Sequence, residues 1–170
     1  MTDHTLNKAE QEILLKIAQE ALEKSVNENP LPDINLELLP PSLQEDGASF
    51  VTLTEHERLR GCIGTLQAYQ PLAVDVQEHA VAAALQDPRF PNVTPKELPG
   101  IAIEVSVLSP RMPLAYNGPQ DLLAKIRPGV DGLVLQDGFR KATFLPQVWE
   151  KIPDPAAFLS QLCLKMGAPA

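Results

Sequence analysis

Strand-like segments come in adjacent pairs along this chain, and this pairing constrains the fold more than any other feature of the sequence. Residues 48–54 and 59–66 are both rich in β-forming side chains and are separated by a short polar stretch. Residues 133–136 and 139–144 form a second pair, and Asp137-Gly138 between them predicts a type I′ hairpin turn. Hairpins build antiparallel sheets, and the helical segments do not recur as βαβ units. The pattern therefore favours an antiparallel sheet over a doubly wound parallel one.

Helical segments flank these strands. Residues 7–23 carry an apolar stripe at helical spacing, and Asn7 with Glu10 has the spacing of a capping box. Alternation over residues 100–109 predicts a further half-buried strand. We expect an α+β fold, with a largely antiparallel sheet flanked by helices and room for a smaller subdomain. Further helices are predicted at residues 71–86, 119–126 and 154–166.

The length of 170 residues argues for a single domain over residues 1–170. Residues 1–47 are expected to form the N-terminal helix and a proline-rich wrap. With 44% hydrophobic residues the chain can build a core, yet no apolar run is long enough to cross a membrane. The N-terminus lacks a signal-peptide pattern, so we expect a cytoplasmic protein. The cysteine and histidine residues are scattered, so we expect neither a metal site nor another cofactor.

The net charge of -8 is unevenly distributed. Residues 1–58 hold 12 acidic and 4 basic residues, whereas the remainder of the chain is balanced. A face that binds nucleic acid needs clustered Lys and Arg, and no stretch of the sequence supplies such a cluster. We therefore expect no direct binding to nucleic acid.

The segment Leu59-Arg60-Gly61-Cys62-Ile63-Gly64 is the strongest candidate for a functional site. Strand alternation places Arg60, Cys62 and Gly64 on one face. A guanidinium group near a thiol stabilises the thiolate, so this arrangement is compatible with an activated Cys62. Glycine inside a strand usually marks a bulge or the close approach of a ligand or another backbone, which makes Gly61 and Gly64 candidate binding positions.

A structural interpretation of the same residues is equally simple. Cys62 would be a small buried hydrophobic residue, and the two glycine residues would relieve crowding. Cys163 lies in the apolar stripe of the last predicted helix and is expected to pack in a core. His79, flanked by Glu78 on the 71–86 helix, is expected to be solvated. From these residues alone, both interpretations of Cys62 stay open.

The hexapeptide at residues 59–64 resembles the signature of the AMMECR domain family, whose prokaryotic members are called AmmeMemoRadiSam system protein A. Further blocks resemble the family in the same order, and the resemblance covers about residues 48–167. These blocks are Phe50-Val51-Thr52-Leu53, Asp87-Pro88-Arg89-Phe90-Pro91, Glu104-Val105-Ser106-Val107-Leu108, Leu145-Pro146-Gln147-Val148 and Lys165-Met166-Gly167. An ordered set of blocks is far more specific than any one of them.

The resemblance implies an α+β fold with an antiparallel sheet and a smaller subdomain. It also implies a protein partner, because family members accompany a Memo-like protein and a radical SAM enzyme. It implies no particular reaction. Asp131 stands where the family often has histidine, and family members usually continue beyond the last helix, so this chain is expected to be a shortened copy.

Arg89 is a candidate binding residue with two interpretations. It either binds an anionic group beside Arg60, or it fixes its own loop through hydrogen bonds with Asp87. Glu104 and Ser106 share one face of the 100–109 strand. If that face is covered, the Glu104 carboxylate needs a cationic partner, for which Arg60 and Arg89 are the natural candidates.

Gln147 can offer its amide to a ligand, or it can fix a turn.

Three functions remain for the chain: an accessory protein that binds a partner or a small substrate around the hexapeptide, an enzyme that uses Cys62 as nucleophile or redox thiol, and a nucleic-acid factor. We favour the accessory protein, because the sequence places no histidine near Cys62 to act as a base. The net charge disfavours the nucleic-acid factor.

Overall fold

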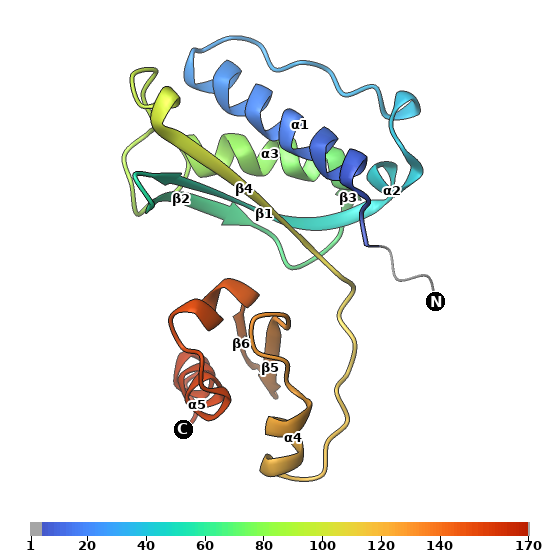
Figure 1. Cartoon of the computed structure of the whole chain (residues 1–170), viewed down its shortest axis with the longest axis vertical. Coiled ribbons are helices and arrows are strands. Elements are labelled where there is room, and N and C mark those ends of the chain that lie inside the picture. The colour runs from blue at the N-terminus through green and yellow to red at the C-terminus, as the bar shows by residue number, and fades with distance from the viewer. Residues whose placement is uncertain (1–4, 170) are drawn as a thin grey trace. The chain divides into compact units, whose positions relative to one another are not determined.

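The computed structural model describes residues 5–169, and the chain divides into two compact units, Met1–Arg111 and Met112–Ala170. All strand pairs in both units are antiparallel, which confirms the α+β class with an antiparallel sheet. The first unit contains α1 (Lys8–Val26), α2 (Pro41–Gln44), β1 (Asp46–Glu55), β2 (Arg58–Gly64), β3 (Gln70–Pro71), α3 (Leu72–Leu85) and β4 (Ile101–Leu108) (Figure 1). The second contains α4 (Pro119–Lys125), β5 (Leu133–Asp137), β6 (Arg140–Phe144) and α5 (Pro155–Met166).

The sheet of the first unit is built around β1. β2 and β4 both pair with the same stretch of β1, and the short β3 pairs with its first two residues. Cys62 on β2 lies opposite Thr52 on β1, which in turn lies opposite Glu104 on β4. This register places the signature strand at one end of the strand order, with β1 as its single strand partner among residues 5–169.

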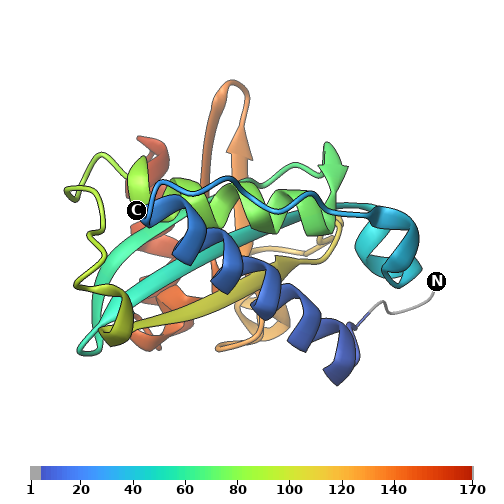
Figure 2. The same ribbon diagram turned by 90° about the horizontal axis from the view of Figure 1, so that it is seen from above.

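Helices α1 and α3 lie side by side on one face of this sheet (Figures 1 and 2). The burial of β1 alternates accordingly, since Ser49, Val51 and Leu53 are fully buried while Phe50 and Thr52 are half-buried. Apolar side chains of α1, α3 and β1, together with Leu43 of α2, form the core of the unit, which includes Leu14, Ala18, Leu22, Val51, Leu53, Leu72, Val76, Ala80 and Ala83.

The first helix begins where the sequence predicts it. The Asn7 side chain accepts a hydrogen bond from the Glu10 N–H at 3.0 Å, and the Glu10 carboxylate accepts one from the Asn7 N–H at 2.8 Å. This reciprocal pair satisfies two N–H groups that a helix otherwise leaves without partners. The capping box is therefore confirmed.

The second unit packs around its only tryptophan. Trp149 is buried and stacks on Phe158 of α5 with ring centroids 3.7 Å apart, and its indole N–H donates to the Asp131 carbonyl at 2.8 Å. Phe144 of β6 meets the same Phe158 ring edge-on. The hairpin is thereby fixed against α5.

Among the described residues, none of the helices combines the length and the apolar character that a membrane span needs.

Two local predictions are wrong. The β5–β6 ladder closes with Asp137 opposite Arg140, so the turn residues are Gly138 and Phe139, one position later than predicted. Only Gly138 has a positive φ, which is the pattern of a type II′ turn rather than a type I′ turn. His79 is buried, with 7% of its surface exposed, because it lies on the face of α3 that packs on the sheet.

Candidate functional site

Cys62 occupies the middle of β2, on the face opposite the helices. Its thiol is half-buried and lies 3.2 Å from the Thr52 hydroxyl on the neighbouring strand. Within the described part of the chain, that hydroxyl is the one group recorded in a hydrogen bond with the sulfur atom. No histidine or carboxylate among these residues contacts the thiol as a base would.

The two glycine residues beside Cys62 are required by close backbone contacts. A Cβ atom on Gly61 would lie 2.1 Å from the Ala83 carbonyl oxygen of α3. A Cβ atom on Gly64 would lie 2.3 Å from the Ser49 carbonyl oxygen of β1. The close approach expected from glycine in a strand is therefore present at both positions, and in both cases the approaching group is the protein's own backbone.

The β1–β2 ladder is irregular at Arg60. Leu53 pairs with Gly61 and Thr54 pairs with Leu59, so the ladder skips Arg60. Simple strand alternation, which places Arg60 on the face of Cys62, does not hold across such an irregularity. Glycine inside a strand marks either a close approach or a bulge. The irregularity at Arg60 is the bulge, and it lies directly beside Gly61.

The Arg60 guanidinium is bound to the segment that follows α3. Its Nε donates to a Glu97 carboxylate oxygen at 2.8 Å, and its terminal nitrogens donate to the carbonyl oxygens of Pro91 and Asn92 at 2.9 and 3.3 Å. The Arg60 side chain is mostly buried in this contact. Within residues 5–169 Arg60 makes no hydrogen bond to Cys62. Its guanidinium forms an ion pair with Glu97 instead.

Asp87 and Arg89 bind the backbone of Cys62 from the outer side of β2. The buried Asp87 carboxylate accepts from the Cys62 N–H at 2.9 Å and from the Arg89 guanidinium at 2.7 and 3.0 Å. Arg89 in turn donates to the Cys62 carbonyl at 3.3 Å. The hydrogen bonds from Arg89, and then the one from Cys62, outweigh burial and hold the pKa of Asp87 far below its ordinary value.

The structure therefore brings together two of the sequence blocks, the hexapeptide and Asp87-Pro88-Arg89-Phe90-Pro91. The interpretation that Asp87 and Arg89 fix their loop is confirmed, because Asp87 also accepts from the Arg89 N–H at 3.1 Å. Asp87 was missing from the predicted site residues. The sequence feature that could have identified Asp87 is its position, directly after a predicted helix and two residues before Arg89.

Glu104 and Ser106 lie on β4, two strands from Cys62, and the Ser106 hydroxyl is 3.4 Å from the Glu104 carboxylate. Neither Arg60 nor Arg89 bonds to Glu104 in the described chain, because both arginine side chains are held by other carboxylates. The pairing expected for Glu104 is therefore not made by either of them.

Gln147 belongs to the second unit, in a 3-10 turn at Pro146–Glu150. In the same unit Asp131 accepts from the Arg127 guanidinium at 2.7 Å. Hydrogen bonds from Arg127 lower the pKa of Asp131 despite its partial burial. Asp131 is thus engaged in a local ion pair.

A buried polar cluster under the sheet was not anticipated from the sequence. The Asp75 carboxylate accepts from the Ser49 hydroxyl at 2.6 Å and lies 3.1 Å from Nδ1 of His79. Burial alone would raise the pKa of Asp75, but hydrogen bonds from His79, Ser49 and Gln70 outweigh it and lower the pKa. The sequence feature that could have predicted this contact is the spacing of Asp75 and His79, because residues four apart lie side by side on a helix.

This cluster does not have the geometry of nucleophilic catalysis. In a catalytic triad the histidine lies between the serine and the acid, whereas here Asp75 lies between Ser49 and His79. Ser49 also has no exposed surface on which a substrate could be attacked. The cluster therefore serves to join α3 to β1. The described residues include no group of three or more potential metal ligands.

The ion pair between Arg60 and Glu97 predicts a loss of stability in acid. Hydrogen bonds from Arg60 and then from the Thr94 N–H lower the pKa of Glu97 from 4.5 to about 2. A carboxyl group whose pKa is lower in the folded state stabilises the fold above its unfolded pKa, and this contribution is lost as the pH falls through the folded pKa. The free energy of unfolding, measured with urea between about pH 5 and pH 2, is expected to fall by less in Glu97→Gln than in the original protein. Glu12→Gln, in an exposed pair with Lys8, should follow the original protein; identical acid profiles for all three proteins would contradict the prediction.

Comparison with known proteins places these features in a family context. The AMMECR1 family model matches residues 15–170 of the chain. A protein from Methanothermobacter thermautotrophicus is 40% identical over 96% of this chain and 85% of its own length. A protein from Thermofilum pendens is 37% identical over 95% of this chain and 81% of its own length. The crystal structure of uncharacterized protein PH0010 from Pyrococcus horikoshii is similar with a TM-score of 0.83 and 33% identity, covering 96% of this chain and 83% of that one.

Proposed function

This chain belongs to the AMMECR1 family, and on that premise we propose that it is an accessory protein of a Memo-like and radical SAM modification system, located in the cytoplasm. In this role it binds a protein partner or a small substrate around the Cys62 strand. The observation that carries the proposal is the pair of hydrogen bonds by which Asp87 and Arg89 hold the peptide groups of Cys62.

That arrangement supports binding more than catalysis. A catalytic thiol needs a base within hydrogen-bond reach, and the hydrogen bond of the Cys62 thiol is to the Thr52 hydroxyl. The glycine contacts and the two arginine–carboxylate pairs instead make the strand rigid. A rigid, preorganised surface loses little conformational entropy when a partner binds, which is what an accessory protein requires.

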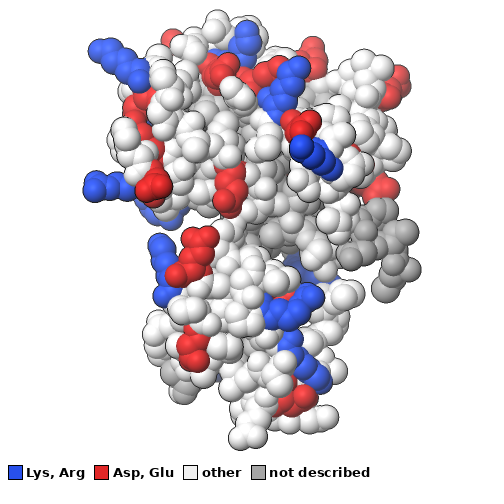
Figure 3. Space-filling view, in the orientation of Figure 1, with Lys and Arg blue, Asp and Glu red and all other residues white. Residues whose placement is uncertain are grey.

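Arg89 is an exposed charged group of this surface. Its side chain is 55% exposed although its inner edge is bonded to Asp87 and Cys62. An exposed guanidinium held in one orientation is suited to a carboxylate or phosphate group on a partner. On the face of the molecule shown in Figure 3, acidic and basic side chains are interspersed and do not gather into one basic area.

Binding of purified partners tests the proposal. We expect the full chain to bind the Memo-like protein or the radical SAM enzyme encoded in the same organism, as measured by isothermal titration calorimetry. Arg89→Gln should weaken binding about tenfold or more, whereas Lys16→Gln, an exposed cation on α1, should leave it unchanged. Absence of heat with both partners, or equal affinity of the Arg89→Gln protein, would rule out this surface as the binding site.

A second candidate function uses Cys62 as a nucleophile or redox thiol. The half-burial of its sulfur beside a hydroxyl, with an arginine on its carbonyl, favours this alternative over a role in core packing alone. Alkylation with iodoacetamide at several pH values, read by peptide mass spectrometry, distinguishes the two. Modification of Cys62 well below about pH 8.5 and faster than that of the half-buried Cys163 would favour the enzyme.

A further inference from the structure

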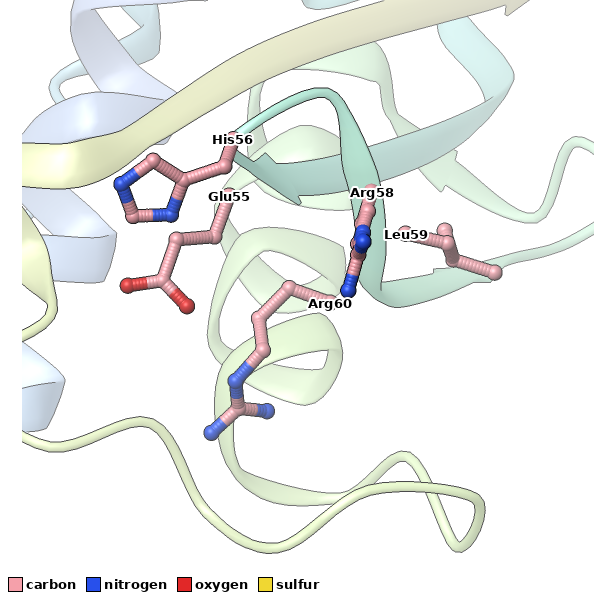
Figure 4. A pocket seen from close by; sticks show the side chains of 5 residues that line it. All are labelled: Glu55, His56, Arg58, Leu59 and Arg60. Atoms are coloured by element: carbon pink, nitrogen blue, oxygen red, sulfur yellow. The ribbon is translucent and has the colours of Figure 1, made fainter.

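An open pocket of about 540 Å³ lies at the β1–β2 hairpin, away from the thiol of Cys62 (Figure 4). Its volume is in the range that small-molecule sites occupy. In the close-up the Glu55 and His56 side chains lie to the left of Arg58, Leu59 lies to its right, and the Arg60 guanidinium lies below them. The lining residues are Glu55, His56, Arg58, Leu59 and Arg60.

Two opposite charges at this pocket do not pair with one another. Glu55 and Arg58 are direct partners in the β1–β2 ladder, which is the arrangement in which oppositely charged side chains normally interact. Among the ion pairs of residues 5–169, none includes Glu55 or Arg58, although pairs are formed by Arg60, Arg89, Arg127 and Arg140. A carboxylate and a guanidinium therefore line the same pocket, and neither has an ion-pair partner among residues 5–169.

The other arginine at the pocket, Arg60, is already bound by groups of the protein. Every nitrogen of the Arg60 guanidinium donates to Glu97 or to the Pro91 and Asn92 carbonyls. Arg60 therefore forms a fixed wall of the pocket, and the available guanidinium is that of Arg58. His56, which is also exposed, makes no ion pair or hydrogen bond within the described chain.

The turn that closes the pocket is held in an unfavourable conformation. His56 and Glu57 have φ values of 49° and 62°, in the left-handed region that ordinary side chains adopt only at a cost. Glycine at either position would avoid that cost. Positive φ at both central residues is the geometry of a two-residue type I′ hairpin turn, and this tight turn sets Glu55 opposite Arg58.

We propose that this pocket binds a small zwitterion of the α-amino-acid class, with its carboxylate on Arg58, its ammonium group on Glu55 and its aliphatic side chain over Leu59. A simple anion would leave Glu55 uncompensated beside it, and a simple cation would do the same to Arg58. A ligand that carries an ammonium group and a carboxylate group on the same carbon atom can neutralise both Glu55 and Arg58. The exposed Leu59 supplies the apolar surface for the remainder of the ligand. This assignment does not rest on the accessory role proposed above.

Three ligands of similar shape test the assignment by ¹⁵N-resolved NMR titration of the full chain. They are L-leucine, which carries both charges, leucinamide, which carries only the cation, and 4-methylpentanoate, which carries only the anion. L-leucine is expected to shift the amide signals of residues 55–60 saturably, with an affinity at least about tenfold above that of either analogue. Absence of saturable shifts at about 20 mM L-leucine, or a stronger response to either single-charge compound, would overturn the proposal.

Matched variants assign the two charges. Arg58→Gln should abolish the advantage of L-leucine over leucinamide, and Glu55→Gln should abolish its advantage over 4-methylpentanoate. Lys141→Gln, an exposed cation of the second unit, should leave all three titrations unchanged. Both pocket residues are at the surface of a hairpin, and the remaining amide signals report directly whether each variant is folded. Unchanged preferences in the two pocket variants would also overturn the assignment.

Discussion

Replacement of Asp87 by alanine is expected to lower the free energy of unfolding by about 3 kcal/mol, the largest effect we anticipate for any polar residue of the chain. The carboxylate is almost fully buried, with 2% of the side chain exposed. Its removal leaves the N–H groups of Cys62 and Arg89 without their acceptor. The Arg89 guanidinium loses its ion pair as well, but water reaches that side chain and reduces this part of the cost.

Urea denaturation followed by far-ultraviolet circular dichroism measures this effect, since the two long helices of the first unit dominate the signal. Asp87→Asn, which keeps one acceptor oxygen, should lose less stability than Asp87→Ala. Glu12→Ala is a matched control in the same unit, because it removes an exposed partner of Lys8 and should cost less than about 1 kcal/mol. If Asp87→Ala and Glu12→Ala were equally stable, the buried carboxylate would not be holding β2.

Replacement of Gly61 by alanine is expected to cost about 2–3 kcal/mol, although it adds only one methyl group. The added carbon would lie 2.1 Å from the Ala83 carbonyl oxygen, and that oxygen belongs to the backbone of α3. A helix backbone cannot rotate away as a side chain can, so the strand and the helix must separate. For a unit of this size, such a loss lowers the melting temperature by about 10 °C.

Gly100→Ala is the appropriate control for this substitution. A Cβ atom on Gly100 would lie 3.6 Å from the Glu55 side chain, which is an ordinary van der Waals distance. Its melting temperature should therefore stay within a few degrees of that of the original protein, about 0.5 kcal/mol in either direction. A Gly61→Ala protein that melts together with Gly100→Ala would mean that α3 is not packed on β2 as described.

Most of the regular structure could be predicted from local patterns. The helix that begins at Asn7, the strand pairs and the last helix, which is capped by Asp154 and ended by Gly167 at φ 78°, are each specified within a few neighbouring residues. The β5–β6 hairpin was predicted but its turn was displaced by one position. A shift of that size depends on which cross-strand pair closes the ladder, here Asp137 with Arg140, and local turn preference does not decide it.

The arrangement of the candidate site was harder to predict, because it depends on contacts between distant segments. Strand alternation places Arg60 beside Cys62, but the ladder skips Arg60 and Glu97 binds its guanidinium 37 residues further along the chain. His79 was expected in water, since its sequence neighbour Glu78 is polar, and the buried Asp75 that it meets is one turn away. Glycine residues 61 and 64 signalled a close approach, yet the sequence did not identify the approaching group as backbone of α3 and β1.

The contacts on the outer side of β2 have a consequence for solubility. A terminal strand exposes N–H and C=O groups that can recruit a strand from another molecule and so start aggregation. At Cys62 those two groups are occupied by the side chains of Asp87 and Arg89, which take the place a neighbouring strand would need. One acid and one base from a single loop thereby end the sheet at β2 and keep separate molecules from joining edge to edge.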